Sequence, residues 1–193
     1  MDVQEKTVEQ KSNKITREEK NTKKAEAHNV ETYRELYDAL TSGDDEVTVN
    51  IKNNITINGS IDISSRYVTI NGEANTINGA NQYQFLNISS GNTVIINNLT
   101  ITNCTSTGNG GAIYNYWGSN LSVNNTQFTG NHAETGGAIY NYYSNLTVTG
   151  TQFTDNHATN DGGAIENYMY SNLTVTDTQF TDNHATLGGA IEN

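Results

Sequence analysis

The sequence predicts an all-β fold: a parallel β-helix, a solenoid in which coils of about 26 residues form three short sheets. Two recurring motifs predict it. The motif G-G-A-I-(Y/E)-N recurs every 26 residues, beginning at Gly110, Gly136, Gly162 and Gly188. Between its copies the motif F-T-(G/D)-N-H-A begins at Phe128, Phe153 and Phe180. A fixed period of this length indicates one structural unit stacked on itself.

The third observation is a change of hydrophobic period. From Glu46 onwards, apolar residues alternate with polar ones in runs that end at Asn, Gly or Ser, which is typical of short strands between turns. Equivalent strands are expected to begin at Val68, Val94, Leu121, Leu146 and Leu173. A unit of this size lacks the helix of a leucine-rich repeat and is too small for a propeller blade. It fits one β-helix coil, with rungs about 4.8 Å apart.

The segments that precede the strands have a different character. Residues 1–29 are rich in charged and amide side chains and are expected to form a flexible tail or linker. Residues 30–45 are expected to hold a helix, over about 32–42, because Thr32 and Glu35 form a capping box and Gly43 offers a stop. The apolar stripe of this helix would cover the first coil of the stack. Its expected members are Tyr33, Leu36, Tyr37 and Leu40.

Within the solenoid we expect irregular coils over 46–109 and regular 26-residue repeats over 110–193. Like residues of successive coils should stack into columns. Four columns are expected to form the core: Leu121, Leu146 and Leu173; Val123, Val148 and Val175; Phe128, Phe153 and Phe180; and Ile113, Ile139, Ile165 and Ile191. The glycine pairs should permit positive φ or close backbone approach. Two asparagine columns should form structural ladders: Asn115, Asn141, Asn167 and Asn193, and Asn131, Asn156 and Asn183.

The charge distribution argues against nucleic acid and anionic lipid as partners. The chain of 193 residues has a formal charge of −11, and all ten Lys and Arg lie at or before Arg66. The rest of the solenoid therefore carries carboxylates without any cation. Such a surface repels phosphate backbones, so nucleic-acid binding is not expected, and it disfavours adsorption to anionic lipid. No apolar run is long enough for membrane insertion, and the single cysteine, Cys104, allows no disulfide within the chain.

An aromatic surface is the best candidate for a binding face. The columns around the G-G-A-I motifs and the turns that follow them are rich in aromatic residues, which can stack on sugars or on a partner protein, or can stabilise a sheet by stacking on each other. Sequence leaves these two roles equally open. The residues of this possible binding face are Tyr114, Tyr116, Trp117, Tyr140, Tyr142, Tyr143, Tyr168 and Tyr170.

No catalytic, cofactor or metal site is expected. A stack of identical rungs repeats the same side chains, whereas catalysis needs unlike groups that converge on one point. His132, His157 and His184 share a column, yet metal ions need ligands around a point, so exposed turn residues are the simpler interpretation. The later carboxylates are expected to be scattered over several coils.

The paired motifs G-G-A-I and F-x-x-N resemble the repeat of the chlamydial polymorphic outer-membrane proteins. The Asn- and Thr-rich phrase Y-N-Y-x-S-N-L-T-V-T is similar to large adhesin-like surface proteins of methanogenic archaea. The resemblance covers residues 30–193, most strongly 110–193. It implies a pectin-lyase-like, right-handed β-helix, export, and a role in attachment.

The function expected from these observations is a non-catalytic, adhesin-like repeat protein of the cell surface or extracellular space that attaches to a glycan or protein. Two alternatives stay open: a passive structural spacer, and a polysaccharide lyase or hydrolase, since that fold hosts both. No signal peptide begins the chain, so we expect an exported fragment whose signal is missing rather than a cytoplasmic protein. The last coil is incomplete after Gly188, and self-association through this uncapped end is expected.

Overall fold

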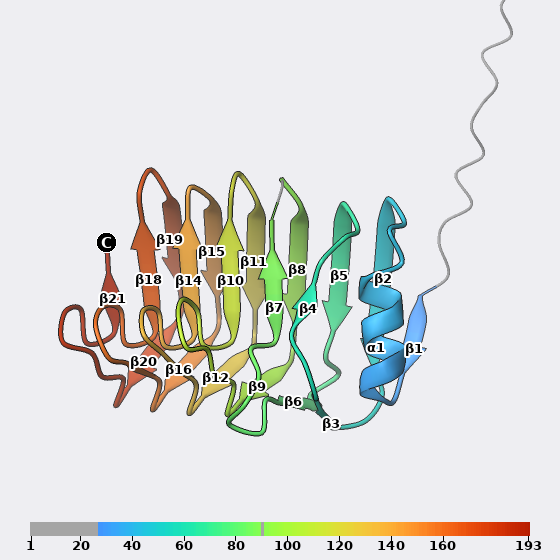
Figure 1. Cartoon of the computed structure of the whole chain (residues 1–193), viewed down its shortest axis with the longest axis horizontal. Coiled ribbons are helices and arrows are strands. Elements are labelled where there is room, and N and C mark those ends of the chain that lie inside the picture. The colour runs from blue at the N-terminus through green and yellow to red at the C-terminus, as the bar shows by residue number, and fades with distance from the viewer. Residues whose placement is uncertain (1–26, 90) are drawn as a thin grey trace, which may run out of the picture.

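The computed structural model describes residues 27–89 and 91–193, and it is a parallel β-solenoid with three main sheets (Figure 1). The predicted tail over 1–29 lies almost entirely outside the described residues. The coils lie side by side along the long axis, with α1 and β1 at one end and β21 at the other (Figure 1). All strand pairs within the described residues are parallel. The predicted fold class is therefore confirmed.

Each coil contributes one strand to each main sheet. The first sheet contains β1 (His28–Val30), β2 (Glu46–Ile51), β5 (Tyr67–Asn71), β8 (Thr93–Asn97), β11 (Asn120–Asn124), β15 (Asn145–Thr149) and β19 (Asn172–Thr176). The second contains β3 (Ile55–Thr56), β6 (Thr76–Asn78), β9 (Thr100–Thr102), β12 (Gln127–Thr129), β16 (Gln152–Thr154) and β20 (Gln179–Thr181). The third contains β4 (Ile61–Asp62), β7 (Leu86–Ile88), β10 (Ile113–Tyr116), β14 (Ile139–Tyr142), β18 (Ile165–Tyr168) and β21 (Ile191–Glu192). A short pair, β13 (His132–Ala133) and β17 (His157–Ala158), lies between the second and third sheets along the chain.

The strand register agrees with the coil alignment predicted from sequence. Val68 pairs with Val94, which pairs with Leu121, and this column continues through Leu146 to Leu173. Because the strands keep their length while the turns absorb inserted residues, side chains of one column point the same way in every coil. The core is therefore a set of continuous apolar columns, from Val30 to Ile165.

The last described coil departs from the predicted core. Phe180 stacks on Phe153 at 5.0 Å, as expected, but it is only half-buried, as is Leu173. Val175 is 38 % exposed. No further coil lies against these side chains in the described chain, so one side of each faces solvent.

The N-terminal helix α1 (Tyr33–Leu40) covers the first coil. Its capping box is formed as predicted: the Glu35 backbone N–H donates to Thr32 Oγ1 at 3.3 Å, and the Thr32 backbone N–H donates to Glu35 Oε2 at 3.2 Å. The helix is slightly shorter than the predicted span of about 32–42, since Thr41 is its C-cap, where φ is −108°. The buried face centres on Leu36, Ala39 and Leu40, whereas Tyr37 is exposed.

Strand β1 extends the solenoid two residues beyond its predicted start at residue 30. It pairs with β2, with His28 opposite Val49 and Val30 opposite Ile51. Only Val30 of its three residues is buried. Main-chain hydrogen bonds hold this strand, so hydrophobic alternation gives no sign of it.

Two buried asparagine ladders run along the axis, as predicted. In one, each Nδ2 donates to the Oδ1 of the next coil, from Asn115 to Asn141 at 2.7 Å and from Asn141 to Asn167 at 2.7 Å. In the other, Asn131 and Asn156 are fully buried and linked at 2.9 Å. Because each amide also bonds backbone groups at the turns, the ladders satisfy polar groups that could not otherwise be buried.

The first ladder begins at Asn115, because the preceding coil has no asparagine at the equivalent position. The residue opposite Asn115 in the preceding coil is Ile88, which has no donor to offer. The Asn115 Oδ1 atom is accordingly buried without a hydrogen-bond partner.

Both predicted roles of the glycine pairs occur, one at each position. Gly110 and its three equivalents have positive φ, between 55° and 67°. At the second position, a Cβ added to Gly137 would lie 2.1 Å from the Gly163 carbonyl oxygen of the next coil. Stacked coils therefore approach too closely at this corner for any side chain.

Candidate functional site

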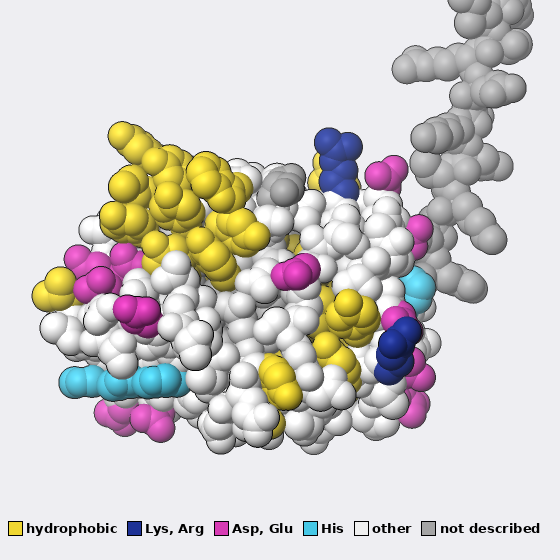
Figure 2. Space-filling view, in the orientation of Figure 1, with side chains coloured by type: hydrophobic (Ala, Val, Ile, Leu, Met, Phe, Trp, Pro, Cys, Tyr) yellow, Lys and Arg dark blue, Asp and Glu magenta, His cyan; other side chains and the backbone are white. Residues whose placement is uncertain are grey.

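The predicted aromatic residues gather on one surface, at the end of the third sheet. We call the outward-facing aromatic residues of β10, β14 and β18, with the turns that follow these strands, the aromatic face. Figure 2 shows it as the largest hydrophobic area on this side of the molecule. Its members are the eight residues predicted from sequence, Tyr114, Tyr116, Trp117, Tyr140, Tyr142, Tyr143, Tyr168 and Tyr170, together with Met169.

Ring contacts connect the aromatic face from coil to coil. Trp117 stacks on Tyr143 with ring centroids 5.5 Å apart and an interplanar angle of 6°. Tyr142 stacks on Tyr168 at 6.0 Å, and Tyr143 contacts Tyr170 at 5.6 Å. Since each contact joins neighbouring coils, the face is one connected aromatic surface.

Exposure divides the face into supporting and accessible members. Tyr140 is 7 % exposed, so it supports its neighbours and offers no surface to a ligand. Tyr114, Tyr116, Tyr142 and Tyr143 are half-buried. The accessible members are Trp117, Tyr168, Met169 and Tyr170, of which Tyr170 is 87 % exposed.

The turns that carry the accessible members have an unusual backbone. Trp117, Tyr143, Met169 and Tyr170 all have positive φ, between 49° and 55°. For a bulky L-residue this left-handed conformation costs about 1–2 kcal/mol, and glycine is the residue that normally occupies it. The sequence thus holds large apolar side chains where folding favours glycine, and most of these side chains face solvent.

The histidine column forms a second surface, away from the aromatic face (Figure 2). His132 stacks on His157 at 4.8 Å and His157 on His184 at 5.3 Å. Burial, followed by the neighbouring imidazoles, lowers the pKa of His157, whereas Asp155 opposes the shift. His132 and His184 are exposed, as expected, but the assignment to turns is wrong for His132 and His157, because they pair in the short strands β13 and β17.

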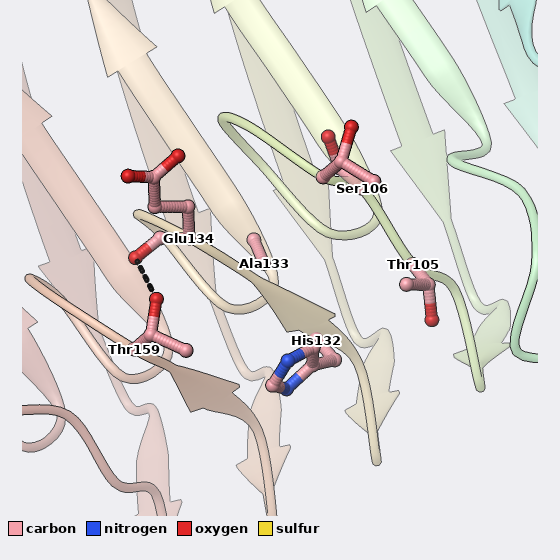
Figure 3. Close-up of a pocket in the computed structure, with 7 residues that line it drawn as sticks. Thr105, Ser106, His132, Ala133, Glu134 and Thr159 are labelled. Carbon is pink, nitrogen blue, oxygen red and sulfur yellow. Dashed lines mark hydrogen bonds between the residues drawn. The ribbon is translucent and has the colours of Figure 1, made fainter.

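An open pocket of about 380 Å³ lies where the histidine column begins (Figure 3). His132 lies at one side of it, and Ser106 and Glu134 lie on the turns above. Thr159 Oγ1 donates to the Glu134 carbonyl at 3.3 Å, which ties two of these turns together. Within residues 27–89 and 91–193, no group of three or more His, Cys, Asp or Glu side chains is close enough to hold a metal ion.

One column of the third sheet changes from tyrosine to glutamate in the later coils. Tyr114, Tyr140, Glu166 and Glu192 share one column of the third sheet. Glu166 is 5 % exposed, and burial followed by the charges of Asp161 and Glu192 raises its pKa to about 7. These acids come from two neighbouring coils, and Asp161 and Glu192 are near enough to Glu166 to raise its pKa.

Cys104 offers no reactive thiol. It is fully buried, and burial raises the pKa of its thiol to about 12. Since the thiolate is the nucleophile, this residue is a small core side chain.

Two segments of the chain, residues 125–142 and 150–168, match the family model of the Chlamydia polymorphic membrane protein (Chlamydia_PMP) repeat. Searches of curated proteins and of solved structures found no match. The matched segments run from the turn before the F-T-(G/D)-N-H-A motif to the third-sheet strand of the same coil. Together with the solenoid fold they fit a β-helix repeat protein of this polymorphic membrane protein type, so the predicted resemblance to the chlamydial repeat is confirmed.

Proposed function

We propose that this chain is a non-catalytic attachment module, whose aromatic face binds a glycan or a protein on another surface. The repeat type supports a surface protein, since its family is one of surface-associated membrane proteins. In the described part of the chain, no helix is both long enough and apolar enough to span a bilayer. Placement of the module at the cell surface or in the extracellular space is part of the proposal.

The exposed aromatic residues at positive φ carry the proposal. Aromatic residues that only stabilised the sheet would be expected in relaxed strand positions, as Tyr140 is. Tyr170 instead has φ of 50° and is 87 % exposed, and among the described residues its ring contacts only that of Tyr143. Strained backbone that is kept despite its cost is characteristic of binding and catalytic sites.

The proposal is tested by binding of the purified chain to a glycan array and to immobilised surface proteins. The variant Tyr170→Ser should lose most of any binding. Its control is Tyr67→Ser, which removes a tyrosine that is 55 % exposed on β5, away from the aromatic face. Equal loss in both variants, or unchanged binding by Tyr170→Ser, would contradict a specific role of this face.

The two alternative functions predict other outcomes of the same experiments. A structural spacer would bind nothing on either array and would tolerate Tyr170→Ser without any change. A polysaccharide lyase or hydrolase would shorten a polymer such as pectin or alginate, and one Asp or Glu substitution would abolish that turnover. The absence of catalysis remains a prediction, as does self-association.

A further inference from the structure

Beside the aromatic face, the buried carboxyl group of Glu166 lies within electrostatic reach of two other carboxylates. We call Asp161, Glu166 and Glu192 the acidic notch, which Tyr140 and Tyr168 adjoin. Glu166 and Glu192 are consecutive in one column, and Asp161 comes from the turn that precedes β18. In the preceding coils the position of Glu166 is held by Tyr114 and Tyr140, so neutral residues are replaced by acids in the later coils.

The key member of the acidic notch is Glu166. It is 5 % exposed, and its Oε2 atom is buried without a hydrogen-bond partner. A carboxylate in this environment is costly unless a cation or hydrogen-bond donors compensate it.

Among the described residues, none supplies such a cation. No Lys or Arg follows Arg66 in the sequence. The salt bridges of the described residues, Arg34–Asp38 and Lys52–Glu73, lie in the first coils at the other end of the solenoid. Within residues 27–89 and 91–193, the acidic notch thus has no cationic partner.

The surroundings indicate which kind of cation fits. The three carboxylates do not form a group that could hold a metal ion, as the described residues contain none. Tyr168 is exposed and follows Glu166 by two residues, on the same side of β18, and aromatic faces attract ammonium and guanidinium groups. Carboxylates pair with the same groups through charge-assisted hydrogen bonds.

We propose that the acidic notch and the adjoining tyrosines receive a lysine or arginine side chain from a basic segment of a partner protein. This rests on the proposed function and narrows it: the ligand of the aromatic face is cationic protein rather than glycan. Glu192 and Asp161, both half-buried at the rim, meet the cation first, and Glu166 forms the inner wall. Acidic glycans are repelled by the same charges.

The test uses the full chain and a synthetic Lys-Gly repeat peptide, with a Glu-Gly peptide of equal length as its counterpart. Trp117 is the single tryptophan and belongs to the aromatic face, so its fluorescence reports binding. The Lys-Gly peptide should bind and the Glu-Gly peptide should not. Glu166→Gln and Glu192→Gln should each weaken binding about tenfold, as expected for loss of a charge-assisted contact.

Two further variants separate a specific site from net charge and from misfolding. Asp182→Asn removes one carboxylate from an exposed turn whose φ of 53° asparagine tolerates, and it should leave binding unchanged. Glu166→Tyr restores the residue of the two preceding coils, so it should fold and yet lose binding.

Each outcome decides between the possibilities. Equal binding of both peptides, or full affinity in Glu166→Gln and Glu192→Gln, overturns the cation site. If that happens while the chain still binds a glycan or protein through Tyr170, only this inference fails. If the chain binds no partner of any kind, the proposed function fails with it.

Discussion

At the scale of single residues, the environment of Glu166 should make folding stability depend on pH. Its folded pKa of about 7 lies above the value of about 4.3 in an unfolded chain. The stabilisation of the protonated form is therefore complete below about pH 4.3, and it is lost as the pH rises to about 7.

The variant Glu166→Gln removes this dependence. Between pH 4.5 and 8 the wild type should lose up to about 3 kcal/mol of unfolding free energy that the variant retains, measured by denaturant unfolding. If the unfolding free energies of the two proteins change with pH in the same way, ionisation of Glu166 costs no extra free energy in the folded protein. That result would contradict the prediction.

His157 should make folding stability depend on pH in the opposite sense to Glu166. Its folded pKa is lowered, so its contribution is present above about pH 6.5 and is lost as the pH falls through the lowered value. In an NMR titration its imidazole should therefore titrate below about pH 6.5. In the variant His132→Thr, which removes one stacked neighbour, the His157 value should move back upwards; an unchanged value would contradict the stacking account.

Gly137 tests the close approach of the coils. Gly137→Ala should cost more than about 2 kcal/mol of unfolding free energy or prevent folding, because its Cβ would lie 2.1 Å from the Gly163 carbonyl oxygen. Gly108→Ala is the matched control, since nothing lies within 4 Å of an added Cβ there. It should change stability by less than about 1 kcal/mol, with both values taken from chemical denaturation.

At the scale of elements, the buried asparagine ladder couples the coils of the third sheet. Asn141 accepts from Asn115 and donates to Asn167 and to the Ser144 carbonyl. Asn141→Ala should cost about 3 kcal/mol or more of unfolding free energy, because it leaves several buried partners unsatisfied.

The comparison variant is Asn145→Ala, which interrupts an exposed ladder formed with Asn120 and Asn172. Water can replace these bonds, so the cost should stay below about 1 kcal/mol. Similar costs for the two variants would show that burial does not decide the strength of the ladders.

The elements also show which structural features the sequence could predict. The strand register from Val68 to Leu173 could be predicted because the sequence repeats once per coil. The core columns could be predicted because apolar and polar residues alternate within each strand. Strand β1 was missed because main-chain pairing with β2 leaves no hydrophobic pattern in three residues. Burial of Val175 was overestimated because periodicity cannot show whether a coil is covered.

The candidate site was predictable in its members but not in its details. The sequence placed the eight aromatic residues in adjoining columns, yet it could not separate buried Tyr140 from exposed Tyr170. It also missed the acidic notch, because the period of the repeat does not show that Glu166 is buried near two other carboxylates. Positive φ at Trp117 has no signal in the sequence, since glycine is the residue expected there.

At the scale of the whole molecule, the two ends of the solenoid differ in chemistry. All ten cations lie at or before Arg66, whereas the aromatic face, the acidic notch and the histidine column belong to the later coils. The stability of a stack is roughly a sum over coils and their neighbours. Side chains on the outside of one turn can therefore serve binding with little effect on the rest of the fold.

The most direct test of this account measures stability and binding together in the variant Tyr170→Gly. Glycine adopts the φ of 50° without strain, and Tyr170 buries little surface, so unfolding free energy should be unchanged or higher by up to about 1 kcal/mol. Binding to whichever surface partner the wild type recognises should be lost. A variant that is clearly less stable and still binds fully would show that the aromatic face serves folding, and would contradict the account.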